Sequence, residues 1–205
     1  MNENKIRIGV LVSGSGSDLQ SIIDAARTEV LSCAAVALVV SNNKEAFALD
    51  RARKEGIPAL FLDPKTFQSR TLYFEQMLHE LNQAKVELVC LAGFLLLLAP
   101  NLVRAYKNRI LNIHPALLPK FGGKGMYGHF VHEAVLKAGE KESGCTVHVV
   151  DDEFDHGPIV LQRKVPVLPG DSPETLAVRV LKEEHILFPE AIRAFIRNAF
   201  PARVE

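Results

Sequence analysis

Four short apolar segments in the first half of the chain constrain its fold more than any other feature. They read KIRIGVLVSG, CAAVALVVSNN, IPALFL and VELVCLAG, and none alternates strictly between apolar and polar residues. Strands that are covered on both faces of a parallel sheet have this pattern. Segments with helical spacing separate them, at residues 18–27, 45–55 and 69–83. This alternation predicts an α/β fold with a doubly wound, mostly parallel sheet.

The second half of the chain has a different pattern. After the turn at Gly93-Phe94 we predict a helix ending near Arg109 and then a strand at ILNIH. A Gly-rich loop, FGGKGMYGHF, precedes a short helix, and GCTVHVVDDEFDHGPIVLQRKVPV reads as two strands around an acidic turn. Ser172 is a plausible N-cap, with Pro173 at the first helical position, for one or two closing helices. We therefore expect a Rossmann-like N-terminal half and a mixed C-terminal part within a single domain, residues 1–205.

Composition narrows the possible partners and compartments. With 205 residues, 48% of them hydrophobic, the chain can bury one sizeable core. Twenty-four basic residues balance 24 acidic ones, which disfavours nucleic acid and membrane partners and favours small molecules. Cys33, Cys90 and Cys145 resemble buried hydrophobes more than a disulfide set. The chain starts without a signal peptide, and its longest apolar stretch is shorter than the ~20 residues that span a bilayer, so we expect a cytoplasmic protein.

The loop SGSGSD, residues 13–18, leads from the first predicted strand into a helix. Loop amides and a helix N-terminus can hold an anion, and glycines allow a phosphate to approach the backbone. The loop lacks the Lys of a Walker A motif, and Leu19 stands where a dinucleotide fingerprint has its third glycine. A tight turn with Asp18 near a helix cap is the alternative interpretation, and the loop alone does not decide between them.

Three polar residues are candidates for catalysis. Asn112 and His114 share strand parity just before Pro115, so both side chains face one spot. The run VDDEFDHGP gathers four carboxylates, and if Asp155 turns inward, burial and like charge should raise its pKa and make it a general base. A structural Asn and His and a solvated acidic turn are the alternatives. His129 and His132 lack further ligands in register, so we expect no metal site.

Taken together, these motifs resemble the phosphoribosylglycinamide formyltransferases of purine biosynthesis, which use 10-formyltetrahydrofolate. The matching stretches are VLVSGSGSDLQSIIDA, VSNNKEAFALDRA, LAGFLLLLAP, ILNIHPALLPKFGGKGMYG, SGCTVHVVDDEFDHGPIVLQ and EEHILFPEAI, nearly the whole chain. The combination of NIHP, ALLP and FDHGPI is highly specific. The resemblance implies formyl transfer from the folate co-substrate to the amine of glycinamide ribonucleotide, without a metal.

The resemblance also implies roles for individual residues. The catalytic roles fall on Asn112, His114 and Asp155, and the substrate phosphate and ribose on Gly16, Ser17, Asp18 and Glu184. The folate pocket corresponds to Phe94, Leu95, Leu96 and Leu98 on one wall and Val150, Asp151, Asp152 and Glu153 on the other. Thr146 and His148 match positions that border the active site and its waters. About residues 1–110 would bind the phosphate and about 111–205 the folate and the reacting groups.

The chain departs from the family pattern at two positions. Many members have Asn in place of Asp18, and a carboxylate would repel a phosphate, so only the backbone amide is carried over there. Some relatives have Arg in place of Leu96, so the folate pocket should be more apolar here. Met126 and Tyr127 are expected near the substrate.

The expected mechanism is attack of the amine on the formyl carbon. Asn112 and His114 would stabilise the oxyanion of the tetrahedral intermediate, and Asp155 would orient the groups and relay a proton toward N10 of the folate. The enzyme would act as a monomer or homodimer.

Three alternatives remain. A methionyl-tRNA formyltransferase usually has a further basic C-terminal domain, and a formyl-folate hydrolase a further N-terminal regulatory domain, so the chain length favours neither. A non-catalytic nucleotide-binding module would explain SGSGSD but leaves Asn112, His114 and Asp155 without a purpose.

Overall fold

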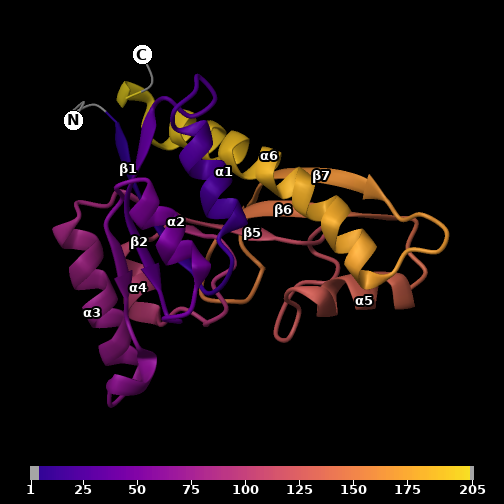
Figure 1. Cartoon of the computed structure of the whole chain (residues 1–205), viewed down its shortest axis with the longest axis horizontal. Helices are drawn as coiled ribbons and strands as arrows, with labels where there is room; N and C mark the ends of the chain where they lie inside the picture. The colour runs from indigo at the N-terminus through magenta and orange to yellow at the C-terminus, as the bar shows by residue number, and fades with distance from the viewer. Residues whose placement is uncertain (1–4, 204–205) are drawn as a thin grey trace.

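The computed structural model describes residues 5–203. One seven-stranded sheet, in the order β3-β2-β1-β4-β5-β6-β7, runs through both halves of the chain (Figure 1). The strands are β1 (Ile6–Val12), β2 (Ala34–Ser41), β3 (Ala59–Phe61), β4 (Leu88–Leu91), β5 (Ile110–His114), β6 (Glu142–Val149) and β7 (Ile159–Pro166). β1 to β5 are parallel, whereas β6 and β7 are antiparallel additions. The predicted α/β fold with a mostly parallel sheet is confirmed.

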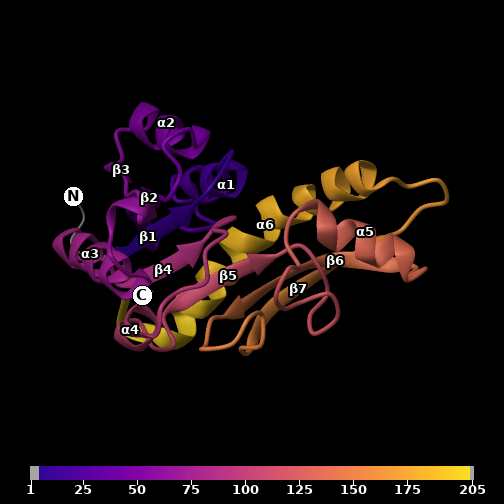
Figure 2. The ribbon, with the colours of Figure 1, turned by 90° about the horizontal axis from the view of Figure 1, so that it is seen from below.

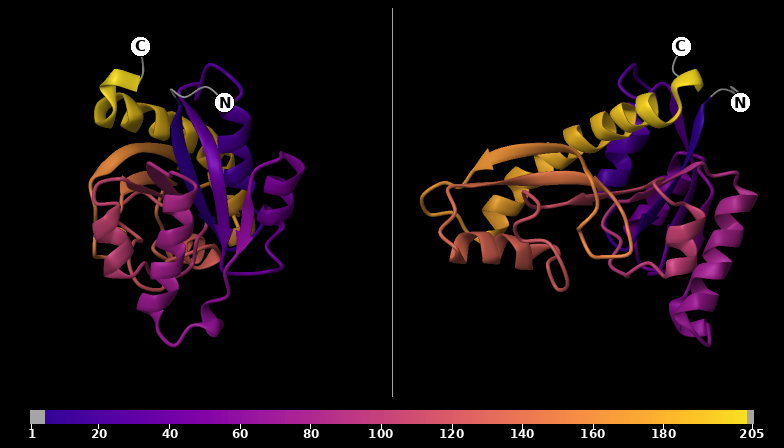
Figure 3. Two further views of the ribbon diagram at one scale, coloured as in Figure 1. Left: turned by 90° about the vertical axis from the view of Figure 1, so that its left-hand side faces the viewer. Right: turned by 180° about the vertical axis from the view of Figure 1, so that it is seen from behind.

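Helices cover both faces of the sheet, as its apolar strands require. One core contains α1 (Ser17–Ala25), α2 (Phe47–Lys54), α5 (His129–Lys137) and α6 (Pro173–Ala199), and the other contains α3 (Arg70–Gln83) and α4 (Pro100–Ala105). Neighbouring residues of β2 serve different cores, Val39 the first and Val40 the second. Figure 2 shows α1 and α2 on the opposite side of β1 and β4 from α4. Figure 3 shows α6 lying along β6 and β7.

The structure corrects one predicted helix boundary and decides how many helices close the chain. α4 ends at Ala105, before the predicted end near Arg109, because Tyr106 leaves helical geometry and Asn108 has a φ of 58°. The buried Tyr106 hydroxyl donates to the Val86 carbonyl at 3.2 Å and fixes this turn. The closing segment is one helix, α6. Ser172 caps it by accepting the Thr175 N–H, as predicted.

The structure bears on three further predictions, which concern the signal peptide, membrane-spanning segments and the cysteines. The polar lead at residues 1–4, on which the expected lack of a signal peptide depends, lies outside the described residues. Within residues 5–203, no helix has the length and apolar character to cross a membrane. Cys90 and Cys145 are buried and Cys33 is half-buried, and all three are free thiols.

The loops that follow β1, β2 and β4 are tied together at the carboxyl edge of the parallel strands. The Ser13 hydroxyl donates to Asn42 Oδ1 at 2.6 Å and accepts the Leu95 N–H at 3.0 Å. Ligands of open α/β sheets bind at this edge, outside the strand ends. The fold therefore gathers the predicted phosphate loop, the turn after β4 and the end of β5 at one place.

Candidate active site

A cavity of about 460 Å³ opens at the carboxyl edge of the sheet. Its lining takes side chains from strand ends, loops and α6. Those discussed below are Asp18, Phe94, Leu95, Leu96, Leu98, Asn112, His114, Met126, Tyr127, His132, His148, Val150, Asp151, Glu153, Phe154, Asp155, Ala177, Val178, Leu181 and Glu184. A cavity of this size is typical of small-molecule sites.

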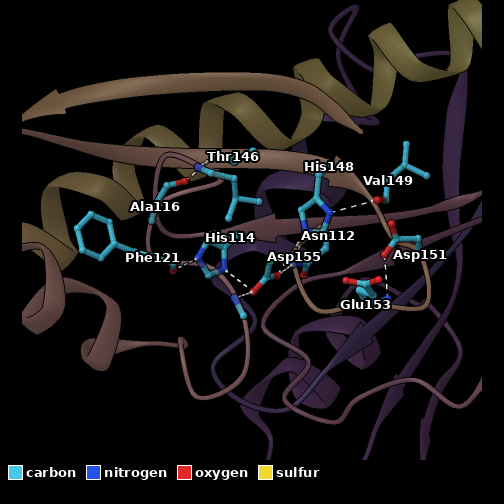
Figure 4. Close-up of polar contacts among 12 residues, drawn as sticks. Asn112, His114, Ala116, Phe121, Thr146, His148, Val149, Asp151, Glu153 and Asp155 are labelled. Atoms are coloured by element: carbon cyan, nitrogen blue, oxygen red, sulfur yellow. Dashed lines mark hydrogen bonds and ion pairs between the residues drawn. The ribbon is translucent and has the colours of Figure 1, made fainter. Parts of the chain in front are cut away.

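The pairing of β5 with β6 places Asn112 opposite His148. Asn112 Nδ2 lies 3.0 Å from His148 Nε2 and 3.4 Å from Asp155 Oδ1 (Figure 4). His148 Nδ1 lies 3.2 Å from the Val149 carbonyl, and its Nε2 also lies 3.5 Å from Asp155 Oδ1. The amide of Asn112 is thus held facing Asp155.

His114 ends β5 with its ring almost fully buried. Its Nε2 donates to the Phe121 carbonyl at 2.8 Å, and its Nδ1 lies 3.6 Å from Asp155 Oδ2, as Figure 4 shows. Burial lowers the pKa of His114 and outweighs the opposing effects of the Asp155 charge and the Phe121 carbonyl. At neutral pH the ring is therefore neutral. The nitrogen that it can offer to a ligand is Nδ1, since Nε2 is already bonded.

Asp155 turns inward from the acidic loop between β6 and β7. Its φ of 52° is in the left-handed region, and Gly157 closes the loop where a Cβ would lie 1.8 Å from the Val149 carbonyl oxygen. Only glycine fits so close an approach. The inward turn of Asp155 that the sequence analysis considered is thus present, with the carboxylate between Asn112 and His114.

The predicted rise in the pKa of Asp155 is wrong. Burial acts to raise it, but the His148 imidazole, the His114 ring and the Gly123 N–H, which donates to Oδ2 at 2.9 Å, together lower it below its ordinary value. The prediction counted burial and like charge and omitted the hydrogen-bond partners. Asp155 is therefore a carboxylate throughout the neutral range.

The neighbouring acids point away from Asp155. Asp151 accepts the Glu153 N–H at 2.9 Å and pairs with His156 Nδ1 at 3.0 Å. Asp151 and Glu153 line the cavity, whereas Asp152 is exposed and lies outside the lining. Asp155 is thus the carboxylate of this loop that lies between Asn112 and His114, and Asp152 is the one outside the lining.

Asp18 of α1, just after the loop that follows β1, and Glu184 of α6 form the polar end of the cavity. Gly16 is the N-cap of α1 with a φ of 71°, and a Cβ there would lie 2.5 Å from the Cβ of Ala48. Gly16 and Ser17 form the loop at the helix start, while Asp18 in the first turn of α1 and Glu184 of α6 line the cavity itself. Burial raises the pKa of Asp18 to about 6. Burial, and then the charge of Asp18, raise the pKa of Glu184 well above its ordinary value.

Comparison with known proteins agrees with this arrangement. Residues 6–192 match the model of the family described as "Formyl transferase". The chain belongs to the formyl transferase family.

Several relatives and solved structures resemble this formyl transferase over most of its length. The phosphoribosylglycinamide formyltransferase of Escherichia coli (strain K12) is 43% identical over 190 residues, which are 93% of this chain and 87% of that protein. The crystal structure of glycinamide ribonucleotide transformylase 1 from Symbiobacterium toebii has a TM-score of 0.90 and 46% identity, covering 96% of this chain and 90% of that one.

A third relative is much longer than this formyl transferase. The trifunctional purine biosynthetic protein adenosine-3 of Drosophila pseudoobscura pseudoobscura is 45% identical over 200 residues, or 97% of this chain. The chain spans 14% of that protein's length.

The remaining wall of this formyl transferase cavity is apolar. Phe94, Leu95, Leu96 and Leu98 from the segment after β4 face Val150 across it, and all were predicted to line a folate pocket. Met126 and Tyr127 of the Gly-rich loop also line the cavity, where they were expected near a substrate. The structure thus brings these residues together in one lining, while their ligand remains a prediction.

Thr146 lies behind the cavity of this formyl transferase. Its hydroxyl donates to the Ala116 carbonyl at 2.6 Å and accepts from the Leu118 N–H at 3.1 Å and from Gln162 Nε2 at 2.9 Å. Thr146 therefore fixes the chain that follows His114. Of the two border residues, only His148 lines the cavity.

The sequence interpretation missed several residues of the cavity. Phe154 is 43% exposed at its rim, and Ala177, Val178 and Leu181 reach it from α6. Ala177 and Leu181 lie one helical turn apart and three to seven residues before Glu184, so helical spacing from Glu184 was a usable signal. His132 was weighed only as a metal ligand. It is a buried cavity residue whose pKa is lowered by burial and then by the charges of His114 and His129.

The arrangement of possible metal-binding side chains was also compared with the expectation of no metal site. Within residues 5–203, no group of three or more His, Cys, Asp or Glu side chains is arranged to hold a metal ion.

Proposed function

We propose that the protein transfers the formyl group of 10-formyltetrahydrofolate to the primary amine of glycinamide ribonucleotide, in de novo purine biosynthesis. The observation that carries this proposal is the convergence of three side chains in one cavity. Asn112 Nδ2 and His114 Nδ1 lie 3.4 and 3.6 Å from the two oxygens of Asp155. The names of the Escherichia coli and Symbiobacterium toebii relatives support the same reaction.

The two ends of the cavity suit the two substrates. The apolar wall of Phe94, Leu96 and Leu98 offers a surface for the pteridine and benzoyl groups of the folate. The start of α1, with the loop amides of Gly16, Ser17 and Asp18, offers donors for the phosphate of the ribonucleotide. Glu184 lies at the same end and would accept a ribose hydroxyl. The reacting carbon would lie between these ends, beside Asn112 and His114.

Formyl transfer needs a stabilised oxyanion and a path for one proton. As the amine attacks, the new C–N bond moves the carbonyl π electrons onto oxygen, and Asn112 Nδ2 would donate to that oxygen. A donor placed in this way is typically worth ~3 kcal/mol of transition-state stabilisation. Nδ1 of neutral His114 would take the proton from the attacking nitrogen, with Asp155 stabilising the imidazolium. The proton would then pass to N10 as the bond from N10 to the formyl carbon breaks.

In this proposal, each half of the chain contributes to the binding of both substrates. Residues 1–110 supply the phosphate loop and the Phe94 wall, and residues 111–205 supply the reacting groups and Glu184. We propose that they act as one catalytic domain, in the cytoplasm, as a monomer or homodimer. Gel filtration with light scattering distinguishes these two assembly states.

The test is an absorbance assay of the folate product with purified protein, 10-formyltetrahydrofolate and glycinamide ribonucleotide. A time-dependent signal that requires both substrates is expected. Two control reactions address the other formyl-folate enzymes: one lacks the ribonucleotide, and the other contains methionyl-tRNA in its place. A signal without the ribonucleotide would identify a hydrolase, and a signal only with the tRNA would identify that transferase. Binding of both small molecules without any turnover would indicate a nucleotide-binding module.

A further inference from the structure

The polar end of the cavity contains two acidic side chains with little compensation. Asp18 and Glu184 face the same cavity, with only 13% of the Asp18 side chain and 7% of Glu184 exposed. Among the described residues, Asp18 Oδ1 is buried and has no hydrogen-bond partner. Buried polar atoms without partners are uncommon and point to a missing ligand.

An unpartnered imidazole nitrogen lies near Asp18. His185 Nε2 is buried, has no hydrogen-bond partner within residues 5–203, and lies 4.0 Å from Asp18 Oδ1. This distance is too long for a hydrogen bond and leaves both atoms available to a group bound at the start of α1. The geometry places an acid and an imidazole side by side where the proposed function places the phosphate.

The other charged and titratable groups around Asp18 come from α2 and β6. Arg51 of α2 lies on the outside of the loop, where its Nε donates to the Ser15 carbonyl at 2.9 Å and its Nη1 to Gln20 Oε1 at 3.3 Å. Burial and then the Arg51 charge lower the pKa of His185, so its ring is neutral at neutral pH. Cys145 of β6 is buried, and burial followed by the nearby acids keeps its thiol protonated.

We propose that the facing pair of Asp18 and His185, beside Glu184, takes up one proton from solvent when the phosphate of the ribonucleotide binds at the start of α1. This inference rests on the proposed function and adds a specificity feature to it. The proton comes from water or a buffer acid and forms an O–H bond at Asp18, whose Oδ1 lies 4.0 Å from the Nε2 of His185. It converts a site with a repelling carboxylate into one with a donor for a phosphate oxygen.

The proton uptake follows from charge balance. A phosphate ester carries close to two negative charges above pH 7. The pKa of Asp18 in the free protein is about 6, so at pH 7.5 this side chain is mostly ionised before the ligand arrives. Binding that requires its protonation weakens by up to about tenfold for each pH unit above that pKa. An Asn at this position carries an N–H donor already and needs no proton.

Isothermal titration calorimetry with formylglycinamide ribonucleotide tests the inference. This product is chosen because its formylated amine does not titrate near neutrality. At pH 7.5, in two buffers with different ionisation enthalpies, the unmodified protein should take up close to one proton per ligand bound. Asp18→Asn should take up close to none. Between pH 7 and 8 its Kd should change less than about twofold, against about tenfold for the unmodified protein.

Asp24→Asn is the matched control, because it removes an exposed carboxylate of the same helix that lies outside the cavity lining. It should keep the proton uptake of the unmodified protein. Heats that do not depend on the buffer in the unmodified protein would overturn the inference even if Asp18→Asn failed to fold. Equal proton uptake in the unmodified protein and Asp18→Asn would equally exclude this pair. Failure of the ribonucleotide to bind would instead overturn the proposed function itself, together with the inference.

Discussion

Asp155 and Asp18 line one cavity and are both largely removed from water, yet their pKa values move in opposite directions. Burial acts to raise both. Asp155 accepts the Gly123 N–H and lies between the His148 and His114 rings, which lower its pKa. Within residues 5–203, Asp18 Oδ1 has no hydrogen-bond partner and lies 4.0 Å from the Nε2 of His185. The comparison shows that hydrogen-bond partners decide the direction in which the pKa of a buried carboxyl group moves here.

The difference has a structural origin in the loops. Asp155 obtains its partners because the acidic loop, closed by Gly157, brings it against the Gly-rich loop and the end of β5. Asp18 stands on the first turn of a regular helix, and α6 supplies Glu184 as its acidic neighbour. The Asp155 carboxylate therefore has its partners within the protein, whereas Asp18 Oδ1 has none among residues 5–203.

The largest effect is expected from Asp155→Asn. An amide has nearly the same shape but no charge to stabilise an imidazolium at His114, so kcat should fall by about 10²–10⁴ while both substrates bind almost as before. Steady-state kinetics and calorimetric Kd values measure the two quantities. Asp152→Asn, which keeps every residue of the cavity, should retain normal turnover. Normal turnover in Asp155→Asn would remove this carboxylate from the mechanism. The proposed functional difference between Asp155 and Asp18 would then be lost as well.

Asn112→Ala should have the next largest effect. Loss of the Nδ2 donor removes one hydrogen bond to the oxyanion, and kcat should fall by about 10²–10³ with a smaller change in KM. The double variant with Asp155→Asn should lose less than the product of the two single effects, because the two groups act on the same intermediate. Fully multiplicative losses would show that Asn112 and Asp155 act independently.

Sequence patterns predicted the sheet and the shared face of Asn112 and His114, and they left the inward turn of Asp155 as one of two possibilities. These features follow from local rules: strand parity, apolar runs and a Gly-Pro turn. The pKa of Asp155 was predicted in the wrong direction. Its partner Gly123 lies 32 residues earlier in the chain, and His148 lies on β6, before the acidic loop. Contacts of this kind depend on tertiary packing, which single residues do not encode.

The cavity-lining residues of α6 also could not be predicted from sequence patterns alone. Glu184 was assigned through the family resemblance, whereas Val178 and Leu181 of the same helix were not. Their approach to the cavity depends on how α6 crosses the sheet beside α1 and β6, as Figure 3 shows for the long helix. The amphipathic pattern of a helix predicts its buried face but not the partner that covers it.

Asp18→Asn should change stability in a pH-dependent way. The folded-state pKa of Asp18 is about 6, above the ~3.9 of an unfolded chain, so the folded protein binds more protons between these values. The stability that this proton contributes is complete below about pH 4 and is lost as the pH rises through 6. Asn removes the cost of the buried charge. The variant should therefore be about 1–3 kcal/mol more stable at pH 8 and no more stable at pH 4.

Chemical denaturation of Asp18→Asn and the unmodified protein at these two pH values measures this difference. Asp24→Asn, on the same helix, is the matched control, since Asp24 lies on the outer side and accepts from Gln20 Nε2 at 2.9 Å in an exposed pair. Equal stability of Asp18→Asn and the unmodified protein at both pH values would contradict the buried charge at the polar end.

The smallest effect is expected from Phe154→Ala, which tests whether the two ends act separately. The ring is 43% exposed at the rim of the apolar wall and makes no polar contact with either carboxylate in the described part of the chain. Its loss should weaken folate binding by ~0.5–1.5 kcal/mol, a few-fold to about tenfold in KM for the folate. Because this contact is the same in the ground state and the transition state, kcat should not change.

KM for the ribonucleotide should also be unaffected by Phe154→Ala. The control is Phe47→Ala, which removes an exposed ring on α2 outside the cavity. A parallel rise in KM for the ribonucleotide would show that the apolar wall and the polar end are coupled through the loop that carries Asp155.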